Sequence, residues 1–184
     1  GISQDVEADD SIWELTKARL PWLLLALGGS FIAVNVSQSF SDAMEKYKIL
    51  FFFTPLIAAM AGNVGVQSSA IIVQGLANNS LTGSVWRRLM KEMLLSLFNS
   101  TILAAILLFG THFLMNTSYE LSFTIGIALV IVMIIASLIG TFIPILLDKY
   151  GVDPALATGP FITTSNDIFG IFIYFTIAQI ILGF

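Results

Sequence analysis

The hydrophobic and polar positions of this chain form long blocks rather than short alternations. Polar residues collect in the connections between five almost wholly apolar blocks, which cover residues 20–36, 50–77, 93–115, 121–147 and 154–184. A helix needs about 20 apolar residues to cross a bilayer, whereas a porin-like barrel shows alternating segments of about ten residues. The pattern therefore predicts an all-α integral membrane protein with five transmembrane helices per chain.

Composition supports this class of protein and removes several others. Hydrophobic residues make up 57% of the 184 positions and charged residues 11%, whereas a soluble domain carries about 25% charged residues. The absence of cysteine excludes disulfides, thiolate metal sites and cysteine nucleophiles. An acidic start argues against nucleic acid as a partner and against a signal peptide. We expect residues 1–19 to be an acidic linker and the end of a connecting helix, and residues 20–184 to be the transmembrane domain.

Charges in the connections predict how the chain crosses the membrane. With the N-terminus inside, six basic residues lie in inner segments and two in outer ones: Lys17, Arg19, Arg87, Arg88, Lys91 and Lys149 against Lys46 and Lys48. Because cytoplasmic connections carry the excess of Lys and Arg, we expect a multi-pass protein of the cell (inner) membrane, with a cytoplasmic N-terminus and the C-terminus outside. An odd number of spans does not divide simply into two inverted halves, but a symmetric homodimer supplies a two-fold axis.

The last apolar block contains a single acidic residue, Asp167, and every other Asp and Glu is expected in a terminus or a connection. A carboxylate near bilayer depth costs about 2.5 kcal/mol or more unless it is compensated, and it usually faces a bundle interior or a wet path. The polar positions of this block share one helical face: Thr163, Asn166, Asp167, Gly170 and Tyr174. Pro160 lacks an N–H group, so we expect the carbonyl of Leu156 to lose its helical partner.

A second polar cluster lies in the second block, at residues 62–69. Asn63 and Gln67 are four residues apart and share a face, while Gly62 and Gly65 allow a close approach of a backbone or a hydrated ion. All these groups offer oxygen ligands, which suit Mg²⁺, Ca²⁺ or Na⁺ better than zinc or copper. One carboxylate is too few for a dry cage, but two copies across a dimer axis would suit Mg²⁺ with several retained waters.

Other interpretations of the same residues remain open at this point. The glycines, Asn63 and Gln67 are also typical of helix packing in membranes, and Asp167 also fits a neutral structural acid. A secondary-active divalent cation transporter or exchanger gathers broken helices at the midplane. An intramembrane aspartyl protease needs two carboxylates, which one chain does not supply, and a non-conducting assembly subunit is a further alternative.

Several motifs together resemble the transmembrane domain of the MgtE family of magnesium channels and transporters. They are Pro55 with Gly62-Asn63-Val64-Gly65-Val66-Gln67, then Trp86-Arg87-Arg88 and Lys91-Glu92, then Asp153-Pro154-Ala155, and finally Thr163-Thr164-Ser165-Asn166-Asp167. The resemblance covers the chain from about Trp13 onward.

The resemblance implies a homodimer with a pore on its two-fold axis, lined by the second and fifth spans. It implies that Asp167 of both chains holds hydrated Mg²⁺, that Asn63 and the backbone carbonyl of Thr163 assist, and that Asp153 at the cytoplasmic mouth takes part in Mg²⁺-dependent gating. Mg²⁺ is then both the transported ion and a gating ligand. The family also carries cytoplasmic regulatory N and CBS domains, which we expect to be missing from this sequence. Gln74 stands where many members have a basic residue.

Overall fold

The computed structural model describes residues 7, 9–81, 83–157 and 159–184, and within these ranges it contains helices and no strand. Five helices are long and apolar enough to cross a membrane, which confirms the predicted class and the predicted number of spans. The helices in chain order are α1 (Ile12–Gln38), α2 (Ser41–Lys46), α3 (Lys48–Ala77), α4 (Val85–Phe109) with its π-helical continuation η1 (Gly110–Leu114), α5 (Tyr119–Lys149), the 3₁₀ turn η2 (Pro154–Ala157) and α6 (Pro160–Leu182).

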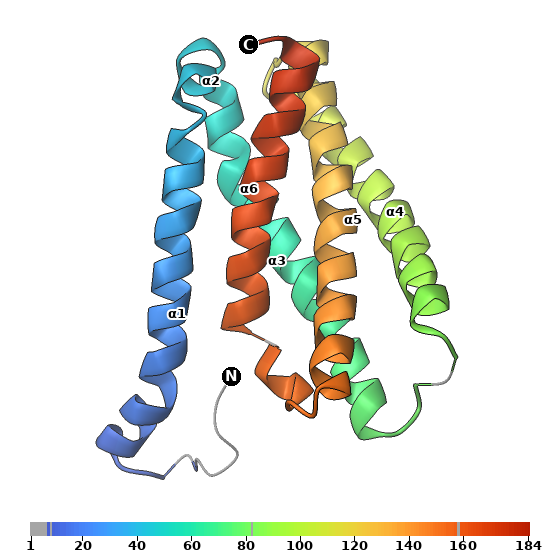
Figure 1. The fold of residues 1–184 in the computed structure, drawn as a ribbon. Helices are drawn as coiled ribbons and strands as arrows, with labels where there is room; N and C mark the ends of the chain where they lie inside the picture. Colours follow the sequence, from blue (N-terminus) through green and yellow to red (C-terminus); the bar gives the residue numbers. More distant parts are fainter. Residues whose placement is uncertain (1–6, 8, 82, 158) are drawn as a thin grey trace.

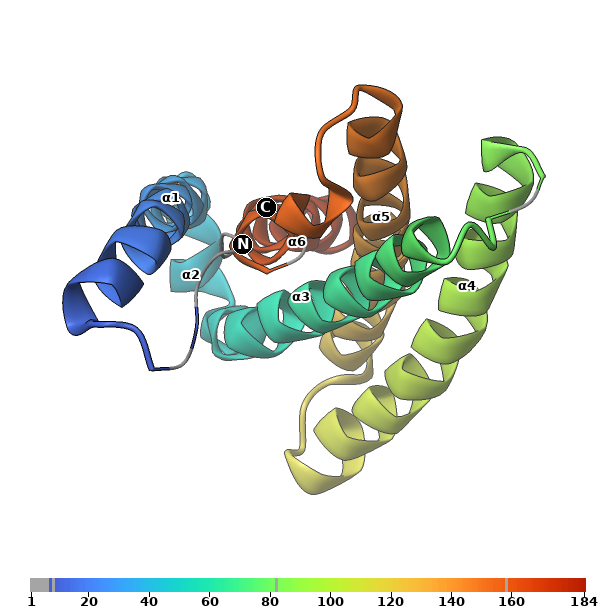
Figure 2. The same ribbon diagram turned by 90° about the horizontal axis from the view of Figure 1, so that it is seen from below.

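The five long helices lie side by side, and the start of α1 and the C-terminus lie at opposite ends of the bundle (Figure 1). Helices α3, α5 and α6 pack against one another at the centre, while α1 packs mainly on α6 and α4 mainly on α5. Seen along the bundle, α1 and α4 occupy its two flanks (Figure 2). Most buried residues therefore lie on α3, α5 and α6.

Local sequence signals set where these helices begin and end. Ser11 forms a capping box with Glu14 at the start of α1, and the Ser84 side chain accepts a hydrogen bond from the backbone at the start of α4. Pro160 occupies the first turn of α6, where its missing N–H has no cost. Gly183 ends α6 in the left-handed conformation that favours glycine.

Two boundaries differ from the sequence expectations. Helix α1 runs without a break across residue 20, so the expected linker and the first span share one helix over the described residues. The last apolar block is divided between η2 and α6. The expectation that Pro160 removes a helical partner from Leu156 is wrong, because α6 begins at Pro160 and Leu156 belongs to the preceding turn.

Small residues bring the central helices into close contact. A Cβ atom on Gly140 of α5 would collide with the backbone carbonyl of Gly65 of α3, and a Cβ atom on Gly65 would collide with the Asn166 side chain of α6. Gly29 of α1 faces Thr164 of α6 in the same way. These contacts are the helix packing that small residues support in membranes, and they fix the position of α3 relative to both α5 and α6.

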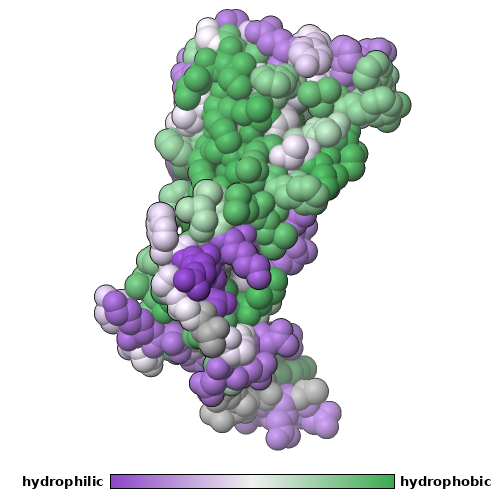
Figure 3. Space-filling model, turned by 90° about the vertical axis from the view of Figure 1, so that its right-hand side faces the viewer, coloured by the Kyte–Doolittle hydropathy of each residue, from purple (hydrophilic) through white to green (hydrophobic). Residues whose placement is uncertain are grey.

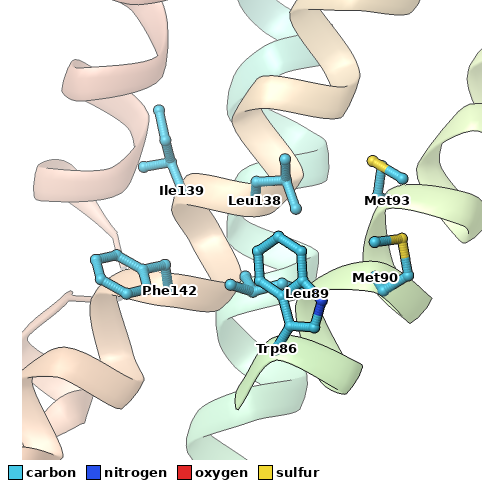
Figure 4. A pocket seen from close by; sticks show the side chains of 7 residues that line it. All are labelled: Trp86, Leu89, Met90, Met93, Leu138, Ile139 and Phe142. Atoms are coloured by element: carbon cyan, nitrogen blue, oxygen red, sulfur yellow. The ribbon is translucent and has the colours of Figure 1, made fainter.

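The outer surface is apolar where the bundle would meet lipid. Figure 3 shows a broad hydrophobic band on the α4 side, with hydrophilic residues gathered toward the ends. A hollow of about 400 Å³ lies between α4 and α5 (Figure 4). Apolar or aromatic side chains line it: Trp86, Leu89, Met90, Met93, Leu138, Ile139 and Phe142. This hollow offers no oxygen ligand from a side chain and does not suit a metal ion.

Candidate functional site

Asp167 is carried by α6, about 10 Å along the helix from its first residue at 1.5 Å per residue. The side chain is half-buried and faces α3 at Gly62: a Cβ atom built on Gly62 would lie 4.0 Å from Oδ1 of Asp167. Among the described residues, no hydrogen-bond or ion-pair partner of the Asp167 side chain is found. A carboxylate within a membrane-spanning helix needs a compensating partner, and the part of the chain that the structure describes does not provide one.

Thr163 lies one turn before Asp167 on the same side of α6. A Cβ atom on Gly62 would lie 3.9 Å from its Cγ2 atom, so Gly62 borders both side chains. The Thr163 hydroxyl lies 3.1 Å from the carbonyl oxygen of Gly159 and 3.2 Å from that of Pro160, and it donates to this pair. A methyl group at Gly62 would therefore be in ordinary contact with both side chains, and a larger side chain there would press against Thr163 and Asp167.

Two other polar residues of the predicted face, Asn166 and Tyr174, attach α6 to α3. Buried Asn166 donates through Nδ2 to the carbonyl oxygen of Ala61 at 3.3 Å, while its buried Oδ1 has no hydrogen-bond partner among the described residues. Tyr174 donates through its hydroxyl to the carbonyl oxygen of Leu50 at 2.8 Å. The face predicted from spacing is thus divided: Thr163 and Asp167 lie at its edge, and the other members are buried in packing.

Asn63 lies next to Gly62 but points elsewhere. Together with Gln67 it lines a hollow of about 380 Å³ between α3 and α4, where the third polar side chain is Asn99 of α4. The structure thus brings Gly62, Thr163 and Asp167 together and places Asn63 on the adjoining side of α3. Sequence reasoning missed Asn99, although an amide within the apolar block 93–115 was a visible signal.

Asp153 lies at the end of the bundle where α6 begins, in the connection between α5 and η2 (Figure 1). Its side chain is exposed, and Oδ1 accepts a hydrogen bond of 2.9 Å from the backbone N–H of Ala155. Asp153 therefore starts the turn that leads into α6 and is separate from the pair formed by Thr163 and Asp167.

Glu92 corrects the expectation that every acid except Asp167 lies in a terminus or a connection. Glu92 is in the second turn of α4, half-buried, and its Oε1 accepts a 2.6 Å hydrogen bond from the hydroxyl of Ser68 on α3. The expectation failed because α4 begins earlier than the apolar block does. Within the described ranges, no group of three or more His, Cys, Asp or Glu side chains is placed to hold a metal ion.

Comparison with known proteins agrees with the sequence motifs. The profile of the MgtE family, described as divalent cation transporters, matches residues 54–177. The chain is 35% identical over 176 residues to the magnesium transporter MgtE of Bacillus subtilis, covering 95% of this chain and 39% of that protein. It is 32% identical over 170 residues to the magnesium transporter MgtE of Thermus thermophilus, covering 90% of this chain and 36% of that protein. It therefore spans less than two-fifths of the length of these relatives, and within that span the chain belongs to the MgtE family.

Proposed function

We propose that this chain forms the ion path of a Mg²⁺-selective channel. The observation that carries the proposal is the carboxylate of Asp167, which lies within a membrane-spanning helix beside Gly62 and has no hydrogen-bond or ion-pair partner among the described residues. The relatives are named magnesium transporters, and oxygen ligands are those that Mg²⁺ prefers. A single carboxylate per chain fits an ion that keeps most of its water shell.

The outward face of α3 supports a homodimer with the path on its two-fold axis. Exposed small and amide side chains follow this face from near the middle of α3 to its last turn: Ala59, Asn63, Gln67, Ala70 and Gln74. Lipid would leave the amides without hydrogen bonds, at a cost of about 2–7 kcal/mol for each unbonded amide. A second copy across a two-fold axis would cover this face, and α3 and α6 of both chains would then line a wet path.

Each predicted site residue has a separate role in this proposal. The two copies of Asp167 supply two negative charges to one hydrated Mg²⁺, and Asn63 and the carbonyl of Thr163 accept hydrogen bonds from its waters. Asp153, at the mouth of the path, binds Mg²⁺ when the channel closes. The regulatory N and CBS domains and membrane lipid are the other partners in the proposal.

The six basic residues assigned to inner segments belong to the end of the bundle where α1 begins, which supports a cytoplasmic N-terminus in the cell membrane. In this orientation a divalent ion that enters a negative interior gains about 4.6 kcal/mol per 100 mV, at about 2.3 kcal/mol per charge. Passive flow therefore suffices to drive uptake. The alternative, a secondary-active divalent cation transporter or exchanger, requires an opposing ion gradient.

The test is Mg²⁺ uptake into proteoliposomes that contain an Mg²⁺-sensitive dye. We expect Asp167→Asn and Asp167→Ala to lower uptake at least about tenfold, the change that about 1.4 kcal/mol of lost ion stabilisation produces. Asp42→Asn, at an exposed residue of α2, is the matched control and should behave as the parent chain. Equal uptake by the parent and the Asp167 variants would refute the proposed ion site.

Two further measurements separate the mechanisms. Uptake that follows the membrane potential without a Na⁺ or H⁺ gradient supports a channel, whereas uptake that needs such a gradient supports the exchanger. Asp153→Asn should leave uptake unchanged at low internal Mg²⁺ and shift inhibition by internal Mg²⁺ to higher concentrations. An unchanged inhibition curve would remove Asp153 from the gating step.

A further inference from the structure

The hollow between α3 and α4 has an unusual lining for a site at bilayer depth. Asn63 and Gln67 of α3 and Asn99 of α4 are its polar side chains, and the rest of the lining is apolar, including Met60 and Met133. Asn99 lies in the interior of α4, more than three turns from its start and almost three turns from its end. The three amides therefore meet in an otherwise apolar environment between two membrane-spanning helices.

None of these three amide side chains forms a hydrogen bond with another described residue. Asn35 of α1 shows the alternative open to an amide in a membrane helix, because its Nδ2 donates to the carbonyl oxygen of Phe31 in its own helix at 2.8 Å. Thr101, two residues after Asn99, likewise bonds the carbonyl oxygen of Leu97 at 2.7 Å. The side chain of Asn99 faces the hollow instead, and an amide without a partner in an apolar environment is unfavourable. All three side chains are exposed on this chain, so water or a hydrated ligand in the hollow would supply the missing hydrogen bonds.

The size and chemistry of the hollow suit a hydrated cation. A volume of about 380 Å³ holds on the order of ten waters at about 30 Å³ each, which exceeds the octahedral water shell of Mg²⁺. Carboxamide oxygens accept hydrogen bonds from bound water and carry no net charge. Such a site would hold a hydrated ion weakly, without removing its waters, and would release it readily.

The hollow also adjoins the carboxylate site. Asn63 lines the hollow, and its neighbour Gly62 borders Asp167, where a Cβ atom would lie 4.0 Å from Oδ1. The hollow and the carboxylate site thus lie beside consecutive residues of α3.

We propose that Asn99, with Asn63 and Gln67, forms a second, outer-shell site for a hydrated divalent cation between α3 and α4. This inference rests on the proposed function and adds α4 to the elements that contact the ion. Asn99 positions the hydrated ion through its water shell, and Asp167 supplies the charge.

Single cysteines provide the direct test, because the chain contains none. Asn99→Cys is compared with Phe98→Cys, the adjacent position on α4, whose side chain is 68% exposed on the apolar surface. Each variant is labelled in proteoliposomes with a charged, water-soluble methanethiosulfonate reagent, with and without hexaamminecobalt(III), a stable analogue of hexahydrated Mg²⁺. Melting curves of both variants in detergent confirm that they are folded.

We expect Asn99→Cys to react and Phe98→Cys to remain almost unreactive. Hexaamminecobalt(III) at about ten times its dissociation constant should slow the reaction of Asn99→Cys about tenfold, because reagent and ion compete for the same space. Labelling as slow as that of Phe98→Cys would overturn the proposal, since the hollow would then be dry. A fast reaction that the cobalt complex does not slow would overturn it as well.

Uptake of Mg²⁺ provides an independent measurement. Asn99→Leu should raise the half-saturating Mg²⁺ concentration about twofold to tenfold, the range that corresponds to one lost hydrogen-bonding group, and Asn99→Gln should restore much of the affinity. Asn35→Leu is the matched control, because it removes an amide that bonds only its own helix, and it should leave half-saturation unchanged. If no variant takes up Mg²⁺ and Asn99→Cys is still labelled and protected, the channel proposal fails and the amide site stands. If uptake depends on Asp167 and Asn99→Leu equals the parent, the amide site fails alone.

Discussion

The contact between Gly140 of α5 and Gly65 of α3 predicts a large difference between two glycine-to-alanine substitutions in one helix. At Gly140 an added Cβ would meet the carbonyl oxygen, carbonyl carbon and Cα of Gly65, all of them backbone atoms. A side chain could rotate away from such a collision, but a backbone cannot, so α3 and α5 must separate. At Gly126, on the same helix, the nearest atoms are the carbonyl oxygen and Cβ of Ala104 at 3.7 and 3.8 Å, which is ordinary contact.

The magnitudes follow from these two environments. Alanine gains about 1 kcal/mol over glycine inside a helix, and overpacking costs about 1–3 kcal/mol, occasionally more. Gly126→Ala should therefore be neutral or slightly stabilising, and Gly140→Ala should lie about 1–3 kcal/mol below it in free energy of unfolding, because the propensity gain is common to both variants. The assay is reversible unfolding in mixed micelles of mild detergent and dodecyl sulfate, followed by circular dichroism. Equal unfolding curves for the two variants would refute the close approach of α3 and α5.

Two other substitutions test the region around Asp167. Gly62→Ala places a methyl group at ordinary contact distance from Thr163 and Asp167, so the free energy of unfolding should change by less than about 1 kcal/mol. Mg²⁺ uptake in proteoliposomes should nevertheless fall, because the methyl group displaces water. Unchanged uptake would show that the ion does not pass this point. Tyr174→Phe removes the buried 2.8 Å hydrogen bond to Leu50 and should lower the free energy of unfolding by about 0.5–1.5 kcal/mol. Tyr150→Phe, at a residue that is 74% exposed, should have no measurable effect. Equal losses in both variants would contradict a stabilising role for the hydrogen bond between Tyr174 and Leu50.

The sequence was sufficient for the number and class of the helices, because a run of apolar residues long enough to cross a bilayer has few other stable structures. It was less reliable for helix ends. Glu92 was assigned to a connection because it precedes an apolar block, yet the cap at Ser84 starts α4 two turns earlier. Hydropathy measures where a helix meets lipid, whereas capping determines where the helix begins.

Residue spacing predicted which polar residues share a face of α6, but it did not predict which residues each of them contacts. Spacing placed Asn166, Tyr174 and Asp167 on one face of α6, and only the structure shows that the first two bond α3 while Asp167 has no partner within the described ranges. Asn99 was missed for a related reason. Its importance depends on the hollow that it shares with α3, and a contact between separate helices leaves no periodic signal in either sequence segment.

One turn of α3 connects packing with the proposed chemistry, and this connection can be measured. Ala61 accepts the hydrogen bond of a buried amide from α6, Gly62 borders the carboxylate, Asn63 lines the hollow toward α4, and Gly65 packs against Gly140 of α5. A separation of α3 from α5 at Gly140 must therefore shift Gly62 relative to the carboxylate. We expect the folded fraction of Gly140→Ala to take up Mg²⁺ more slowly per molecule than Gly126→Ala, with uptake normalised to folded protein by size-exclusion chromatography. If the two variants take up Mg²⁺ equally, the α3–α5 contact maintains the stability of the bundle without setting the geometry of the ion site.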